Sequence, residues 1–219
     1  MYPAPRPSTF DGVVGILLAA GFAHRFVAAA GVSKLLYPLE NGVLLGSATA
    51  TLWKSALDKV LAVVSPEKPE LMRLLGDTGC EIVVAERSHE GMGASLACGI
   101  AAARARYPAA RGWVVGLADM PFVKQSTLTH IATALSDGAA IVAPTYEGRR
   151  GHPVGFTAHY GARLAALGGD EGARHLIACE PAALRLLPVD DPGIHADIDT
   201  PDDLIAWQTR HPLPESAAV

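Results

Sequence analysis

Two aspartates that are far apart in the sequence have the chemistry of metal ligands. Asp119 ends an apolar run in "GLADMPF", and a carboxylate at the end of a buried strand is costly unless it is paired, hydrogen-bonded or bound to a metal. Asp199 lies in "HADIDTPDDL". Capping of the following helix explains Thr200 but gives no role to Asp199. Carboxylate oxygens are ligands that Mg²⁺ prefers. We therefore expect Asp119 and Asp199 to converge on one Mg²⁺ ion, and alternation along an extended segment predicts that Asp197 points to the opposite face from Asp199.

Small residues and two cations follow the first apolar run, in "LLAAGFAHRFVAAAGVSKLL". Small side chains let a backbone approach a ligand closely, and loop N–H groups together with cations hold phosphate. The residues with this potential are Leu18, Ala19, Ala20, Gly21, Arg25 and Lys34. Neither GxxxxGK[ST] nor GxGxxG occurs, so a plain turn with two solvated cations remains an equally good interpretation of the composition.

Two further segments carry candidate ligand contacts. Gly91, Gly93 and Ser95 in "GMGASL" precede or open a helix, where they could bind a ring, a ribose or a phosphate, although simple N-capping is the commoner role. His152 lies in the turn "GRRGHPV", and a single loop histidine is more often structural or merely exposed.

The elements that must position these residues alternate between strands and helices, which predicts an α/β fold with a three-layer, doubly wound, mostly parallel sheet. Ligands bind such a sheet beyond the carboxyl ends of its strands. "TYEGRRGHPVGF" predicts a turn into a further strand, in the antiparallel sense. We expect one domain over residues 1–219, with an ordered core from about 11 to 211 and short loose tails.

The predicted strands are Val13–Leu18, Asp58–Val64, Glu81–Ala85, Gly112–Ala118, Ala139–Ala143 and Leu184–Val189. The predicted helices are Val43–Ser55, Pro66–Leu75 (begun by its proline), Ala94–Arg106, Gln125–Leu135, His159–Leu167, Asp170–Cys179 and Pro201–His211.

Composition excludes several classes of function. The net charge is −4 and no basic run occurs, which argues against nucleic acid as a partner. Three cysteines without a CxxC pattern indicate reduced thiols and no disulfide framework or zinc site. No signal peptide and no apolar run long enough to cross a bilayer is present, so we expect a cytoplasmic protein without a membrane partner.

Five segments in this order resemble the MobA-like family of molybdenum cofactor nucleotidylyltransferases. They are "LLAAG" with Arg25 and "KLL", then "GMGASL", "LADMP", "GHPV" and "DIDTPDDL", and together they span nearly the whole chain. The resemblance implies a Rossmann-like fold of the nucleotide-diphospho-sugar-transferase type. It also implies transfer of a nucleotide from an NTP to the terminal phosphate of molybdopterin, with Mg²⁺ and with pyrophosphate as product. Ala20 stands where the guanosine-preferring form has glycine, which implies CTP.

The same resemblance implies roles for the candidate residues. Leu18 to Gly21 contact the nucleotide through the main chain, Gly93 and Ser95 contact its base or ribose, and His152 lies on the acceptor side. Arg25 and Lys34 neutralise the β and γ phosphates, while Asp119 and Asp199 hold Mg²⁺. Attack on the α-phosphorus demands positioning and charge stabilisation more than covalent chemistry. A molybdoenzyme or its maturation chaperone is then a possible partner protein.

Several alternatives stay open. The segment "VAAAGVS" resembles an insertion, which could be looped out or could misplace Lys34. The enzyme could use GTP, or another phosphorylated acceptor such as a sugar phosphate. A non-catalytic molybdenum cofactor carrier has no need of two metal carboxylates, and an NAD-dependent dehydrogenase lacks support because the first turn has no three glycines.

Overall fold

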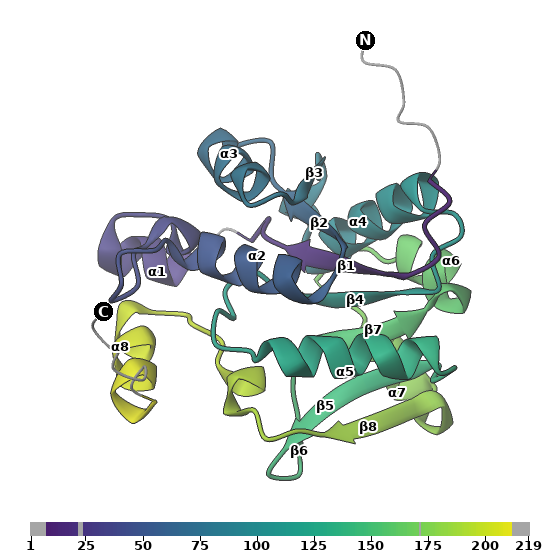
Figure 1. Cartoon of the computed structure of the whole chain (residues 1–219). Coiled ribbons are helices and arrows are strands. Elements are labelled where there is room, and N and C mark those ends of the chain that lie inside the picture. The colour runs from purple at the N-terminus through teal and green to yellow at the C-terminus, as the bar shows by residue number, and fades with distance from the viewer. Residues whose placement is uncertain (1–7, 22–23, 171, 212–219) are drawn as a thin grey trace.

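The computed structural model describes residues 8–21, 24–170 and 172–211, and within this part of the chain it shows one twisted sheet of eight strands (Figure 1). The strand order is β3-β2-β1-β4-β7-β5-β6, and β8 pairs with β5. The strands are β1 (Val13–Leu18), β2 (Lys59–Val64), β3 (Glu81–Val84), β4 (Gly112–Leu117), β5 (Ile141–Tyr146), β6 (Arg149–Arg150), β7 (Val154–Thr157) and β8 (Leu184–Pro188).

The sheet is mixed but mostly parallel, as the alternation of elements predicts. Strands β1, β2, β3 and β4 pair in parallel, and β8 is parallel to β5. Strand β7 lies antiparallel between β4 and β5, which confirms the antiparallel strand expected after the "EGRRG" turn. The register places Leu18 opposite both Val63 and Leu117, so β1, β2 and β4 end together at one edge of the sheet.

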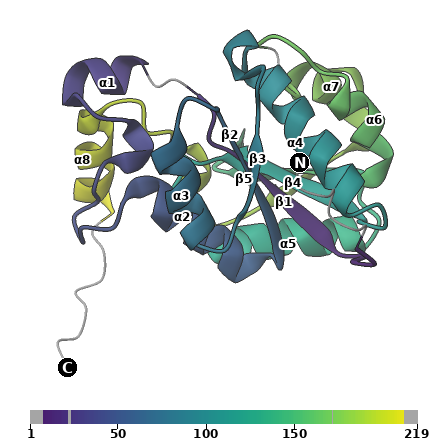
Figure 2. The ribbon, with the colours of Figure 1, turned by 90° about the horizontal axis from the view of Figure 1, so that it is seen from above.

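Helices cover both faces of the sheet, which makes three layers (Figures 1 and 2). Helices α2, α3 and α5 pack on one face, and α4, α6 and α7 pack on the other. Helices α1 and α8 lie side by side at one end of the molecule. The α-helices are α1 (His24–Ala30), α2 (Leu45–Ala56), α3 (Pro69–Asp77), α4 (Met92–Arg106), α5 (Gln125–Ser136), α6 (Gly161–Ala165), α7 (Arg174–Cys179) and α8 (Pro201–Arg210).

Two helices, α3 and α7, begin three or more residues later than the sequence predicts because of local backbone chemistry. Helix α3 begins at Pro69 and not at Pro66, since residues 65–68 form a turn closed by the Lys68 N–H to the Ser65 carbonyl (3.1 Å). Helix α7 begins at Arg174 and not at Asp170, because Gly169 and Gly172 have φ of +60° and +22°, which a right-handed helix excludes.

Two other stretches also depart from the prediction. The expected helix over 159–167 is split into a 3-10 turn (Ala158–Tyr160) and the short α6, and its end tightens through a Leu167 N–H bond to the Leu164 carbonyl (3.3 Å). Helix α1 was not predicted. It contains the alanines of "VAAAGVS", which favour helix, and Gly31 at φ +71° ends it.

The segment just before β1 is attached to the fold. The Ser8 N–H donates to the Arg106 carbonyl (2.9 Å), and Phe10 packs edge-on against Tyr107. The rest of the predicted tails, residues 1–7 and 212–219, lies outside the described residues.

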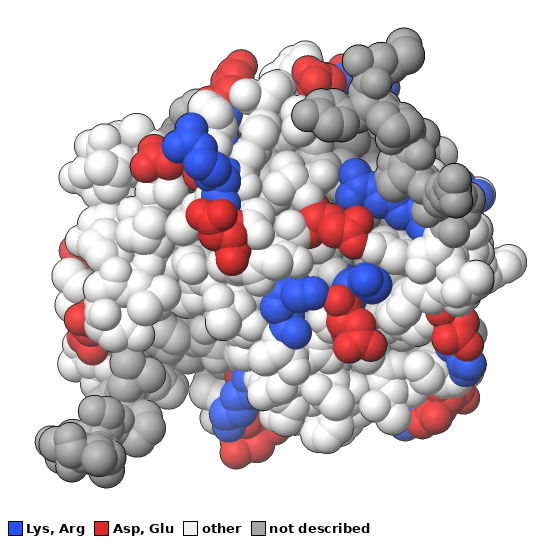
Figure 3. Space-filling model, turned by 45° about the horizontal axis from the view of Figure 1, so that its top comes forward, with Lys and Arg blue, Asp and Glu red and all other residues white. Residues whose placement is uncertain are grey.

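Two general features of the molecule are the distribution of surface charge and the length and polarity of the helices. On the face in Figure 3, acidic and basic side chains are interspersed on a largely uncharged surface. In the described part of the chain, every helix is too short or too polar to cross a bilayer.

Candidate active site

The small residues after β1 line a cavity of about 490 Å³ at the carboxyl edge of the sheet. Leu18, Ala19, Ala20 and Gly21 all contribute to its wall. The Ala19 N–H bonds the Val63 carbonyl (2.8 Å), which continues the ladder with β2 past the end of the strand. Ala19 and Ala20 are 2% exposed and line the cavity, so no long side chain there keeps a ligand away from the main chain.

Lys34 lies in the same cavity, in the 3-10 turn η1 (Lys34–Leu36). Its Nζ is 2.6 Å from Oδ2 of Asp119 and 3.4 Å from Oδ1 of Asp199, and its side chain is only 7% exposed. The segment "VAAAGVS", which includes the end of α1, therefore leaves Lys34 among the carboxylates. Arg25 lies in α1, and its side chain is outside the described part of the structure.

The two predicted metal ligands converge from distant parts of the chain. Asp119 follows β4, and Asp199 precedes α8. A capping box positions Asp199, because Oδ2 of Asp203 accepts hydrogen bonds from the N–H groups of Thr200 (2.8 Å) and Asp199 (3.2 Å). Oδ1 of Asp119 is buried and has no hydrogen-bond partner within the described residues. Buried polar atoms normally have a partner, so this oxygen is available to a ligand.

Asp197 joins this group, contrary to the expectation that it points to the opposite face from Asp199. Residues 196–200 do not form a strand, so the alternation of an extended segment does not apply, and both carboxylates line the cavity. Burial, the neighbouring carboxylate of Asp119 and that of Asp199 raise the pKa of Asp197 to about 6, partly offset by the Lys34 ammonium.

This carboxylate group fits a divalent metal that is shared with a ligand. Within the described residues, no three His, Cys, Asp or Glu side chains are grouped closely enough to hold a metal alone. Mg²⁺ is commonly held by one or two carboxylates together with the phosphates of a substrate. Asp119 and Asp199 therefore suit a metal whose remaining ligands come from a bound nucleotide.

The loop before α4 forms another wall of the cavity. Gly91 and Ser95 line it, and the Ser95 hydroxyl donates to the Gly91 carbonyl (3.3 Å) without capping the helix. Gly93 does not line this cavity. Its N–H donates to the Gly169 carbonyl (2.7 Å), and a Cβ there would lie 2.6 Å from the Gly168 carbonyl oxygen. The structure thus places Gly93 in a backbone-to-backbone contact with the loop before α7.

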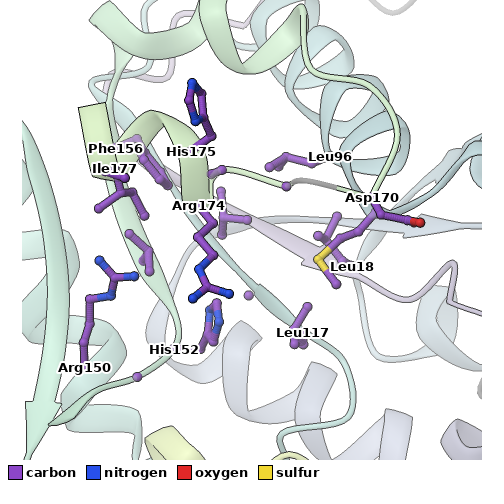
Figure 4. Close-up of a pocket in the computed structure, with 18 residues that line it drawn as sticks. Leu18, Leu96, Leu117, Arg150, His152, Phe156, Asp170, Arg174, His175 and Ile177 are labelled. Carbon is purple, nitrogen blue, oxygen red and sulfur yellow. The ribbon is translucent and has the colours of Figure 1, made fainter. Parts of the chain in front are cut away.

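His152 lies in a second, larger cavity of about 800 Å³, which adjoins the first (Figure 4). Its N–H donates to the Ile194 carbonyl (3.0 Å), and a Cβ at Gly151 would lie 2.4 Å from that same oxygen. The 3-10 turn that carries Ile194 is anchored by the buried carboxylate of Asp191. Desolvation and the Arg150 guanidinium lower the pKa of His152, which favours a neutral imidazole, while Asp119 partly opposes this shift.

Sequence reasoning missed Lys68, which lies in the turn before α3. Its Nζ donates to the Gly21 carbonyl and so ties this turn to the loop after β1. Burial lowers the pKa of Lys68, the Glu67 carboxylate partly opposes this shift, and the nearby Lys34 ammonium adds to it. A lysine in a loop has no pattern in one sequence that would single it out.

Asp170 was assigned only to a helix, yet it lines both cavities from the loop before α7. Its glycine neighbours were the available signal, because they favour a loop over a helix start.

The strand order is that of the nucleotide-diphospho-sugar-transferase type of fold, and acidic and cationic groups gather at the carboxyl edge of its parallel strands. The chain belongs to the family of MobA-like NTP transferase domains, whose model matches residues 15–193. No curated protein sequence matches the chain.

Solved structures support this assignment. Rv0371c from Mycobacterium tuberculosis superposes with a TM-score of 0.77 and 28% identity over 91% of this chain and 98% of that one. A second structure of Rv0371c, in complex with manganese, gives 0.73 and 28% identity over 89% and 96%.

Two more distant proteins share the fold. The nucleotidyl transferase Mth528 from Methanothermobacter has a TM-score of 0.75 and 22% identity over 92% of this chain and 98% of that one. The 4-diphosphocytidyl-2C-methyl-D-erythritol synthase from Anaerococcus prevotii has 0.67 and 14% over 91% and 96%.

Proposed function

We propose that this nucleotidyltransferase transfers CMP from CTP to the terminal phosphate of the molybdenum cofactor and releases pyrophosphate. The observation that carries the proposal is the cluster of Lys34, Asp119 and Asp199 beside the small-residue loop after β1. Choice of CTP over GTP is supported by Ala20, which stands where the guanosine-preferring form of the family has glycine. The "GHPV" and "DIDTPDDL" segments support the choice of acceptor.

The residues of the cavity have distinct tasks in this reaction. An oxygen of the acceptor phosphate attacks the α-phosphorus of CTP, and the bond from that phosphorus to the pyrophosphate oxygen breaks. The attacking phosphate is already an anion near neutral pH, so no general base is required. The Lys34 ammonium, with Arg25, is assigned to the charge that develops on the leaving pyrophosphate.

A divalent cation is the implied cofactor, and Mg²⁺ is the ion we propose. Asp119 and Asp199 would hold it, and the manganese complex of Rv0371c supports a divalent metal in a protein of this fold. When bound, the ion supplies positive charge at the phosphates. The main chain of Leu18 to Gly21 and the Ser95 region would orient the nucleotide, while His152 would lie against the acceptor.

Pyrophosphate release tests the proposal directly. Purified protein is incubated with Mg²⁺ and molybdenum cofactor, and with CTP or GTP in parallel. We expect release with CTP and little with GTP. Release with GTP alone would overturn the interpretation of Ala20. Release with neither nucleotide would overturn the proposal that the molybdenum cofactor is the acceptor.

The variant Asp119→Asn distinguishes a catalytic role of the protein from a role as a non-catalytic carrier of the molybdenum cofactor. We expect turnover to fall at least about a hundredfold while CTP still binds, because a carboxamide keeps the shape but loses the charge that a metal needs. Unchanged turnover in this variant would contradict the metal role of Asp119.

A further inference from the structure

Asp191 is a buried carboxylate to which the transfer reaction gives no task. The residue is 1% exposed, and burial of a charged group is costly unless its oxygens are hydrogen-bonded. Oδ2 accepts hydrogen bonds from the Lys124 N–H (2.8 Å) and from the Thr127 hydroxyl (2.6 Å). Oδ1 accepts one from the Gly193 N–H (3.0 Å). One carboxylate therefore joins its own turn to the start of α5, which lies 64 to 67 residues away in the sequence.

The two parts of the chain that Asp191 joins each carry one of the carboxylates assigned to the metal. Lys124 ends the loop that follows Asp119 and leads into α5. Gly193 lies in the 3-10 turn that leads to Asp199. The position of Asp199 relative to Asp119 therefore depends on hydrogen bonds that neither of these two residues makes.

The turn that Asp191 anchors also packs directly on the loop after Asp119. A Cβ at Gly193 would overlap the Phe122 carbonyl group and the Val123 nitrogen, so only glycine permits this approach of the two backbones. Because the backbones are already in contact, a short carboxylate can bond to both of them. The hydrogen bonds of Asp191 and the missing side chain of Gly193 thus support the same junction.

An aromatic stack attaches the other end of the same segment to this loop. Phe122 stacks on Trp207 of α8, with ring centroids 5.2 Å apart and an interplanar angle of 21°. Residues 196–200 form neither helix nor strand, so no hydrogen-bond ladder fixes Asp199 from within. Its place is set from both sides, by the junction at Asp191 before it and by α8 after it.

We propose that Asp191 is a positioning residue of the metal site, which fixes Asp199 relative to Asp119 so that both carboxylates reach one divalent ion. This inference rests on the metal in the proposed function, but it requires neither the proposed acceptor nor turnover. Mg²⁺ demands near-ideal octahedral geometry, so a small displacement of one carboxylate lowers its affinity. The apparent affinity falls with the fraction of molecules in which both carboxylates are in place.

Binding of Mn²⁺ to the full chain with CTP, followed by electron paramagnetic resonance against CTP alone as the blank, tests the proposal without catalysis. Mn²⁺ suits the same oxygen ligands and octahedral geometry as Mg²⁺. Thr127→Val removes one donor to Asp191 and should weaken Mn²⁺ binding about fivefold to tenfold. Asp191→Asn should weaken it at least about tenfold, because either orientation of the amide turns its NH₂ group toward a donor. Thr127→Ser keeps the hydroxyl and should restore the affinity.

Tyr160→Phe is the matched control for general stability. The Tyr160 hydroxyl also belongs to a buried residue and donates to a carboxylate over 2.6 Å, that of Glu180, but both residues lie outside the metal cavity. We expect Tyr160→Phe to lose about as much thermal stability as Thr127→Val and yet to bind Mn²⁺ like the wild type. In pyrophosphate release, Thr127→Val should need more metal for half-maximal rate, and saturating metal should restore most of its kcat.

The outcomes separate this proposal from the proposed function. Wild-type Mn²⁺ affinity in Thr127→Val and Asp191→Asn would overturn the positioning role and leave the transfer reaction intact. If Asp191→Asn does not fold, Thr127→Val decides, because it leaves Asp191 both of its backbone donors. An equal loss of Mn²⁺ affinity in Tyr160→Phe, or no Mn²⁺ binding by the wild type at millimolar concentration, would also overturn the role. If the variants lose affinity as expected but the wild type transfers no nucleotide to any acceptor, the proposed function fails while the positioning role stands.

Discussion

The ammonium of Lys34 lies 2.6 Å from Oδ2 of Asp119 and 3.4 Å from Oδ1 of Asp199. One buried cation thus joins the loop after α1, the end of β4 and the segment before α8. A divalent ion held by Asp119 and Asp199 would use oxygens of the same two carboxylates. The contacts of Lys34 with them therefore link the stability of the protein to its metal and nucleotide binding.

Replacing Lys34 with alanine should lower both stability and activity. The variant leaves Asp119, 19% exposed, without its counter-charge, so we expect the free energy of unfolding to fall by about 3 kcal/mol at neutral pH. Turnover should fall at least about a hundredfold through loss of charge stabilisation. Urea unfolding and pyrophosphate release measure the two effects.

Lys124→Ala is the matched control, because Lys124 pairs with Asp190 at the surface (3.6 Å). An exposed ion pair is worth about 1 kcal/mol or less, so this variant should remain close to the wild type. Similar losses in both variants would contradict a special role for Lys34.

Asp197→Asn should stabilise the metal-free protein above about pH 6. Burial and the neighbouring Asp119 raise the pKa of Asp197 to about 6, whereas the pKa in the unfolded chain is about 3.9. The folded state therefore binds more protons between these values, and its stability falls as the pH rises through them. The variant should gain about 1 kcal/mol near pH 7.5, a figure reduced because Asp197 is only partly buried and solvent screens its charge, and nothing below about pH 4.

Thermal unfolding in EDTA across this pH range measures the effect. Asp190→Asn, at an exposed position, is the control and should show no comparable gain. A variant that is less stable than the wild type at pH 7.5 would rule out the unfavourable ionisation of Asp197.

Gly93, packed beside the cavity, and Gly21, in its wall, should respond differently to an added methyl group. A Cβ at Gly93 would lie 2.6 Å from the Gly168 oxygen and 2.8 Å from the Gly169 oxygen, so Gly93→Ala should cost about 1–3 kcal/mol of stability. A Cβ at Gly21 meets no atom within 4 Å, so Gly21→Ala should unfold like the wild type. Its methyl group at the cavity wall should nevertheless weaken CTP binding.

Calorimetric titration with CTP and thermal unfolding separate the two glycine effects. Wild-type CTP affinity in Gly21→Ala would show that the loop after β1 does not approach the nucleotide.

Lys68→Met should weaken nucleotide binding by about five- to tenfold. Lys68 bonds the Gly21 carbonyl and lies near Lys34, so it adds positive charge beside the expected phosphates. The loss should be larger for CTP than for CMP, which lacks the β and γ phosphates. Lys59→Met is the control, because Lys59 begins β2, whereas Lys68 lies in the turn that follows the end of this strand. An equal loss for CTP and CMP would limit Lys68 to positioning the loop.

Local patterns were enough to predict most of the sheet and the central helices. The strand Val13–Leu18 has the predicted bounds, and the predicted Thr200 cap and Pro201 start of α8 are confirmed. These features depend on apolar runs and on capping chemistry that neighbouring residues supply. The boundaries of α3 and α7 were missed where a turn or a left-handed glycine overrode the apolar pattern.

By itself, the sequence determined the alternation of strands and helices and the placement of Lys34, Asp119 and Asp199 where strands end or helices begin, because those patterns are local. Only the tertiary structure decided that Asp197 faces the same cavity as Asp199, and that Lys68 reaches Gly21 from another turn. It also decided that Arg150 and Arg174 line the larger cavity. Such contacts join residues distant in sequence, and they depend on how strands pair and layers pack, which no short stretch of sequence encodes.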